Sequence, residues 1–176
     1  MAALRWAATL VDVRLSALVV ATLLIFPLAC GRTHGATVAR VLDGDTITLQ
    51  DGRHVRLVQL DAPETDENEC YADEAKQALQ RLLPFGTRVE IETDPALDHI
   101  DVYGRMLADV EKNGANINLE LVREGAASPY FFHGDRGRYS LDLLAAANEA
   151  SRHQRGLWGA CSGTALDPLH PVQARS

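Results

Sequence analysis

Short runs in which apolar and polar positions alternate follow one another after residue 35, and this spacing is typical of β-strands. The hairpin signal Asp-Gly at 51–52 separates two of them. A two-residue turn would place Ile47 opposite Arg56, whereas a shift by one residue aligns Ile47 with Leu57. We therefore expect a longer turn or a bulge near Gly52. The pattern predicts five strands, at residues 36–42, 46–50, 55–60, 88–93 and 105–111.

Three segments instead repeat apolar residues at helical spacing, and they predict helices at 71–83, 116–124 and 140–155. Gly125 is suited to end the second of them. A helix inserted before the fourth of five strands indicates an α+β, mainly β fold. The order fits a five-stranded OB-fold barrel, closed or partly open, with about three helices. The strand count alone also permits a sandwich.

The first thirty residues have a different pattern. Arg5 and Arg14 precede an apolar run whose core, 17–26, has the length of a signal-peptide apolar region and is short for a membrane span. Residues 1–30 are therefore predicted to be a signal peptide or a lipoprotein-type leader, with Cys30 as a possible lipidation site. An uncleaved anchor is the alternative. We expect an exported protein that is periplasmic, secreted or membrane-tethered outside the cytoplasm, and that meets a membrane only through this leader or its lipid.

The remaining chain divides into a linker at 31–35, one domain at 36–161 and a loose tail at 162–176, in which two prolines and little periodicity predict no regular structure. Without the leader, the domain keeps Cys70 and Cys161. Two cysteines in an exported domain usually form a disulfide, and two free buried thiols are the alternative.

The composition limits the possible functions. The chain has 176 residues, of which 47% are hydrophobic, so it can bury a core and is not disordered as a whole. The formal net charge is -7, which excludes attraction to nucleic acid over the whole surface. Binding of a polyanion would require a local basic site or a bound cation.

Candidate chemistry lies in two short acidic segments and two arginines. Asp45 starts the second strand and Asp61 ends the third, so neighbouring antiparallel strands bring both to one end of the sheet. Carboxylates and an exposed backbone carbonyl are ligands for Ca²⁺ or Mg²⁺. Guanidinium groups at Arg56 and Arg105 can bind phosphate in a bidentate manner, and Glu64 could orient or deprotonate a water. Each of these features also has an ordinary explanation. The acidic segments are also typical of tight turns, and the arginines of a turn or of the solvent-facing side of a strand.

In combination, these segments resemble the staphylococcal nuclease (thermonuclease) family. The resemblance rests on residues 41–46, 55–64 and 101–108, with matches to later helices at 118–125 and 156–158, and covers about 36–160. It implies the OB barrel and a calcium-dependent endonuclease that hydrolyses DNA and RNA to 3′-phosphate products. Relatives that bind nucleic acid or protein without cutting leave a catalytically weak binding module as the alternative. A monomer is expected.

The resemblance also implies residue roles. Asp45 and Asp61 would bind one Ca²⁺ by carboxylate and Ala62 by its carbonyl, while Glu64 would position or activate the attacking water. Arg56 and Arg105 would bind the scissile phosphate, and Tyr103 would lie near the nucleotide.

Three departures from the family pattern bear on substrate binding. Val102 replaces a lysine, and the loop at 65–70 is acidic where the family's best-known member is lysine-rich, which weakens polyanion binding. The segment 129–133 has no clear alignment. We expect Tyr130 or Phe131 to be a stacking platform for a base, with packing in the core as the alternative.

Overall fold

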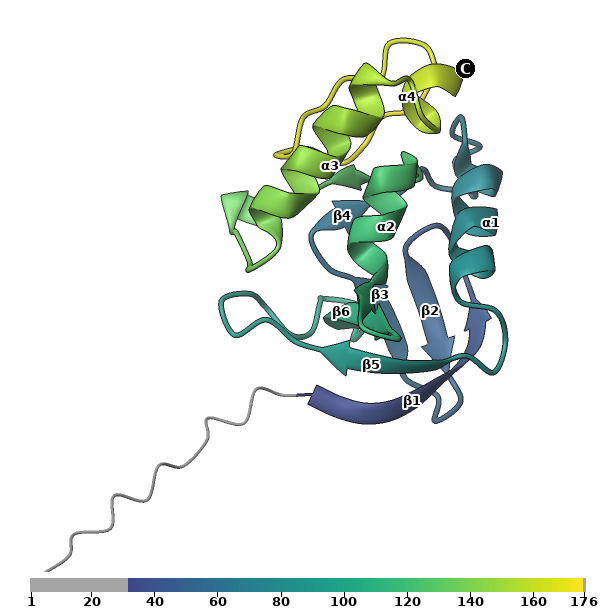
Figure 1. Cartoon of the computed structure of the whole chain (residues 1–176), viewed down its shortest axis with the longest axis vertical. Helices are drawn as coiled ribbons and strands as arrows, with labels where there is room; N and C mark the ends of the chain where they lie inside the picture. Colours follow the sequence, from purple (N-terminus) through teal and green to yellow (C-terminus); the bar gives the residue numbers. More distant parts are fainter. Residues whose placement is uncertain (1–31, 176) are drawn as a thin grey trace, which may run out of the picture.

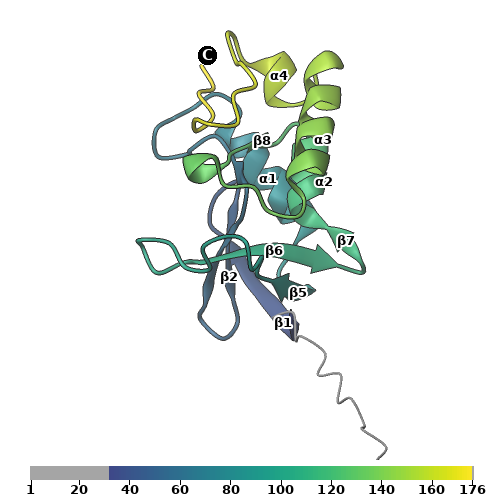
Figure 2. The ribbon, with the colours of Figure 1, turned by 90° about the vertical axis from the view of Figure 1, so that its left-hand side faces the viewer.

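The computed structural model describes residues 32–175, which form a barrel covered by helices on one side (Figures 1 and 2). The proposed leader, Cys30 included, lies outside the described residues. The strands are β1 (Arg32–Val41), β2 (Thr46–Leu49), β3 (His54–Leu57), β4 (Leu60–Asp61), β5 (Arg88–Glu92), β6 (Met106–Lys112), β7 (Ala115–Asn116) and β8 (Ser128–Pro129). The helices are α1 (Ala72–Leu82), α2 (Ile117–Glu124), α3 (Ser140–Arg152) and α4 (Leu157–Ala160), with a 3₁₀ turn at Phe132–Gly134.

Five strands close the barrel. Its main sheet has the order β3-β2-β1-β5-β6-β7, and an additional pairing of β3 with β6 joins the two edges. That pairing is parallel, with Val55 beside Met106 and Arg56 beside Leu107, whereas the other pairs of this sheet are antiparallel. The expected five-stranded barrel with three main helices is confirmed, and closure removes the sandwich alternative.

The β2–β3 hairpin has a longer turn, as expected, but its register differs from the expected one. Ile47 pairs with Val55 and Thr46 with Arg56. Leu49 donates its N–H to the Arg53 carbonyl at 2.9 Å. A three-residue loop is therefore enclosed, and Gly52 adopts the positive φ of 89° that such loops require. Relative to a two-residue turn, the observed register is shifted by one residue in the direction opposite to the predicted shift. This register buries Ile47 and Val55 together.

Helix α2 ties the barrel to the segments that carry the candidate chemistry. The Asn116 side chain caps its first turn by accepting from the Leu119 N–H at 2.9 Å. The side chain of Asn118 is fully buried; its amide nitrogen donates to the Val58 carbonyl at 3.0 Å, and its oxygen accepts from the Val110 N–H. This one residue therefore fixes the end of β3 against β6.

Two predicted boundaries are wrong. Residues 32–35 are not a linker, because β1 begins at Arg32 and pairs with Glu92 of β5. Residues 162–175 are not loose: Ser162 and Arg175 form a β-bridge, and the side chains of Val172 and Ala174 are buried. Residues 32–35 are too few to show a strand pattern, and in the tail the alternation of exposed and buried positions is confined to residues 171–175. None of the helices formed by the described residues has both the length and the apolar character needed to cross a membrane.

Candidate active site

The turn between β1 and β2 holds the side chain of Asp45, the first of the predicted metal ligands. Its N–H donates to the Asp43 carboxylate at 3.0 Å, and the Thr46 hydroxyl donates to its carboxylate at 2.9 Å. Between the two acids, Gly44 is buried so tightly that an added Cβ would lie 2.6 Å from the Cβ of Ala62. A glycine is therefore needed here, because only a residue without a side chain lets this turn approach the segment after β4.

Asp45 and Asp61 converge on one guanidinium group. Arg56 of β3 lies between them, with an ion pair to Asp45 and a 2.6 Å hydrogen bond to Asp61 Oδ1. Asp45 is 2% exposed and Asp61 7%, so both charges are almost removed from water. The Ala62 N–H donates to Asp45 Oδ2 at 3.2 Å and thereby joins the two acidic segments. The predicted meeting of these residues is thus observed.

The surroundings of the cluster shift the pKa values of Arg56 and Asp61. Burial lowers the pKa of Arg56, but Asp45 and Asp61 outweigh it and leave the pKa above its usual value. Burial raises the pKa of Asp61, and Arg56 acts against it. Two carboxylates and one guanidinium leave a net charge of about -1 when all three are ionised, so the cluster favours a further cation.

Glu64 follows at the rim of the cluster. Its N–H donates to the carboxylate of Glu69 at 2.8 Å, and its carbonyl accepts from the Glu69 N–H at 3.2 Å. Burial, followed by the charges of Asp45, Asp43 and Asp61, raises the pKa of Glu64 to about 7. The loop thus holds a half-buried carboxyl group beside the converging acids.

Arg105 is held by a different partner. It lies immediately before β6, one strand away from Arg56, and its Nε donates to Asp101 Oδ2 at 2.7 Å. Its Cζ lies 5.3 Å from the centroid of the Tyr103 ring, and Tyr103 is 81% exposed. The half-buried Arg105 and the exposed Tyr103 therefore form a pair next to the strand that carries Arg56, while the ion pair of Arg105 is made within its own turn.

One expected stacking residue is wrong. Phe131 is fully buried, and its ring cannot meet a base from solvent. Tyr130, which precedes Phe131 in the extended segment, is partly exposed, and Phe132 begins the 3₁₀ turn that follows. Phe132 is 56% exposed, contacts Tyr130 edge-on at 6.3 Å and stacks on His133 at 3.9 Å. The sequence prediction missed Phe132, because a run of three aromatic residues does not show that a 3₁₀ turn begins there.

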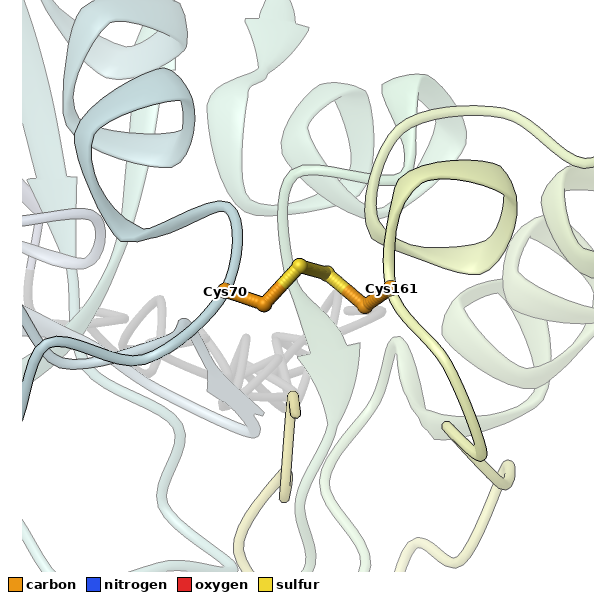
Figure 3. The surroundings of a disulfide bond; sticks show 2 residues. All are labelled: Cys70 and Cys161. Carbon is orange, nitrogen blue, oxygen red and sulfur yellow. A yellow bond between two sulfur atoms is a disulfide. The ribbon is translucent and has the colours of Figure 1, made fainter. Parts of the chain in front are cut away.

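Two further contacts hold the segments around Asp61 and Glu64 in place. The second carboxylate oxygen of Asp61 accepts from the Val172 N–H at 2.9 Å. The loop that carries Glu64 ends at Cys70, which forms the expected disulfide with Cys161 across a Cα–Cα distance of 5.8 Å (Figure 3). The sequence prediction included the disulfide but missed Val172, because no local pattern indicates a contact across 111 positions.

A buried carboxylate also lies outside this cluster. Asp109 of β6 is 3% exposed and accepts from the Asn116 side chain at 3.2 Å. Burial is the main cause that raises its pKa to about 7, against the hydrogen bond from Asn116.

The donor set decides which ion could bind. Within residues 32–175, no group of three or more His, Cys, Asp or Glu side chains is placed to hold a metal. The cluster offers two carboxylates that already share one cationic group, and the Ala62 backbone beside them. Oxygen donors of this kind suit a hard ion that takes further ligands from water or substrate.

Comparison with known proteins places the chain in a sequence family. The model of the staphylococcal nuclease homologue family matches residues 54–160. An uncharacterized endonuclease of Escherichia coli O157:H7 is 36% identical over 152 residues, covering 83% of this chain and 87% of that protein. Endonuclease YhcR of Bacillus subtilis is 35% identical over 147 residues, which is 75% of this chain but 12% of that protein. Endonuclease YncB of Bacillus subtilis is 30% identical over 129 residues, 69% of this chain and 60% of that protein.

Proposed function

The chain belongs to the staphylococcal nuclease homologue family, and from this we propose that it is a calcium-dependent endonuclease that hydrolyses phosphodiester bonds of DNA and RNA. The observation that carries the proposal is the convergence of Asp45, Asp61 and Arg56 in a buried cluster with Glu64 at its rim. Relatives named as endonucleases support the general activity.

The proposed cofactor is one Ca²⁺ ion. Asp45 and Asp61 would hold it by their carboxylates and Ala62 by its backbone carbonyl. These ligands fit a calcium ion, because the carboxylates of Asp45 and Asp61 both point toward the guanidinium group of Arg56. Their two negative charges exceed its single positive charge by one. When bound, the ion would supply positive charge for a phosphate and a nearby water.

The chain's own residues have separate proposed roles. The Glu64 carboxylate would orient a water and hold its proton as the water oxygen attacks phosphorus. Arg56 and Arg105 would bind the non-bridging phosphate oxygens, whose charge grows in the transition state. The bond from phosphorus to the 5′ oxygen breaks, which leaves a 3′-phosphate and a 5′-hydroxyl.

Binding of the bases is proposed for two exposed aromatic residues, Tyr103 and Phe132, and for the partly exposed Tyr130. Tyr103 lies beside Arg105, and Tyr130 and Phe132 form an edge-on pair, so both groups could stack on bases. With a net charge of -7, the protein would depend on these residues, the two arginines and the metal for its grip on nucleic acid.

Export and a monomeric state belong to the same proposal. The Cys70–Cys161 disulfide supports export, because such bonds persist in oxidising compartments. Tethering through the leader or through a lipid on Cys30 would be the means of membrane contact.

The test is cleavage of DNA and of RNA by the mature domain, with Ca²⁺ or with a chelator. Labelling of new 5′-hydroxyl ends reports the position of the break. We expect cleavage that needs Ca²⁺ and falls by roughly 10²-fold or more in Arg105→Ala and Glu64→Gln. Arg152→Ala, which changes an exposed arginine of α3, is the matched control. Binding without cleavage would instead favour a nucleic-acid-binding module.

A further inference from the structure

The C-terminal strap, defined here as residues 162–175, packs against the candidate active site. Val172 is 7% exposed and Ala174 4%, and both join an apolar cluster with Leu157, Trp158 and Cys161. Figure 2 shows this segment, in yellow, next to the blue loop that precedes α1. The strap is therefore an ordered part of the domain.

Three backbone hydrogen bonds fix the strap to segments around the site. The Val172 N–H donates to Asp61 Oδ2 at 2.9 Å. The Cys70 N–H donates to the Ala174 carbonyl at 3.2 Å, and the Phe131 N–H to the Pro168 carbonyl at 2.7 Å. The first of these reaches a charged side chain in the buried cluster, and hydrogen bonds to charged groups are the stronger ones.

The two oxygens of Asp61 have different partners. Oδ1 faces Arg56 at 2.6 Å, and Oδ2 faces the Val172 N–H. Arg56 can turn about its side-chain bonds, but the strap N–H is a backbone group, and the buried side chain of Val172 holds it in place. When Arg56 moves toward a substrate, the hydrogen bond from Val172 therefore still restrains the carboxylate plane of Asp61.

A covalent bond closes the same arrangement. Cys161 stands directly before the strap and Cys70 at the end of the loop that carries Glu64, and the disulfide joins them (Figure 3). Together with the bond from Cys70 N–H to Ala174, it holds the strap and the loop to each other at two points.

We propose that the strap is a positioning element of the metal site, in which the Val172 N–H holds Asp61 in the orientation that binds calcium. This inference rests on the proposed function. Groups that hydrogen-bond to ligating carboxylates typically contribute 10–100-fold to metal affinity, so the strap should act on the metal more than on the barrel.

The test compares two substitutions at one position in the full mature domain. Val172→Pro removes the N–H donor, and Val172→Ala keeps it while removing most of the side chain. Calcium affinity is measured by calorimetry, and thermal unfolding in chelator shows whether each variant folds. We expect Val172→Pro to bind Ca²⁺ roughly 10–100-fold more weakly, and Val172→Ala to stay within about three-fold of the original protein, less than the 10-fold lower bound for loss of such a hydrogen bond.

Cleavage assays separate positioning from a general loss of folded protein. A positioning role predicts that high calcium restores the rate of the proline variant at a temperature where unfolding in chelator shows that variant to be already fully folded, so that stabilisation of the fold by calcium cannot explain the recovery. Equal calcium affinity in a folded proline variant, or an equal loss in both variants, would overturn the inference.

A measurement on the unchanged protein covers the case in which the proline variant does not fold. The Val172 amide resonance should shift on addition of Ca²⁺, and an unmoved resonance would also overturn the inference. If the unchanged protein neither binds Ca²⁺ nor cleaves nucleic acid, the proposed function itself fails.

Discussion

Removal of the Arg56 charge should destabilise the protein strongly without calcium and much less with it. In Arg56→Gln, the carboxylates of Asp45 and Asp61 would remain buried at 2% and 7% exposure without their shared partner. Breaking a buried ion pair by removing one member costs about 3–5 kcal/mol. We expect this loss in the free energy of unfolding at pH 8.

Calcium should reverse much of the loss. A ligand present at 100 times its dissociation constant stabilises the folded state by about 2.7 kcal/mol. In the variant, Arg56 no longer competes for the carboxylates, so calcium should stabilise it more than it stabilises the original protein. The assay is urea denaturation at pH 8 in chelator and in calcium, followed by circular dichroism.

The control removes an arginine from an exposed pair on the same hairpin. The side chains of Arg53 and Asp51 are 36% and 50% exposed, and such pairs contribute less than about 1 kcal/mol. If Arg56→Gln costs no more than Arg53→Gln in chelator, then the buried ion pair does not exist in solution and the reasoning is wrong. A variant that calcium stabilises less than the original protein would contradict competition between Arg56 and the ion.

Three further predictions concern stability. Asp109→Asn should raise the free energy of unfolding by about 2–3 kcal/mol more at pH 8 than at pH 5. The reason is that the pKa of Asp109 is raised to about 7 in the folded protein, so its ionisation destabilises the fold as the pH rises. Asp98→Asn, at an exposed position, should show no such dependence. Gly44→Ala should lower the melting temperature and weaken calcium binding together, and unchanged values would refute the close contact. Replacing Cys70 and Cys161 by serine should cost up to about 4–5 kcal/mol in denaturant titrations, given the separation of 91 residues; equal stability of the oxidised and reduced original protein would argue against this.

The sequence predicts the elements of the fold well because most of them bury one face. Alternation in the strands and helical spacing in 71–83 and 140–155 are local signals of that burial. The parallel pairing of β3 with β6, which closes the barrel, joins residues such as Arg56 and Leu107. This pairing has no local signal in the sequence. The sequence therefore predicts a closed barrel only as one of two possible architectures, the other being a sandwich.

The predicted site residues divide in the same way. Asp45 and Arg56 could be brought together from sequence, because they belong to neighbouring strands of one hairpin, whereas Asp61 lies on the separate strand β4, which pairs with β8. The register itself was wrong, because the pattern does not reveal that Gly52 takes a positive φ in a three-residue loop. Phe131 was misassigned, because a run of three aromatic residues does not show which ring turns inward.

The 111-residue separation between Asp61 and Val172 also has a consequence for the order of folding. The barrel strands and α1 to α3 are complete by residue 152, so the core can assemble before the strap docks. The hydrogen bond to Asp61 needs Val172 of the strap, which can form it only after the segment that follows residue 152 has folded back onto the core. The barrel can therefore be native while its acidic cluster is still incomplete, and the cluster matures as the last residues dock.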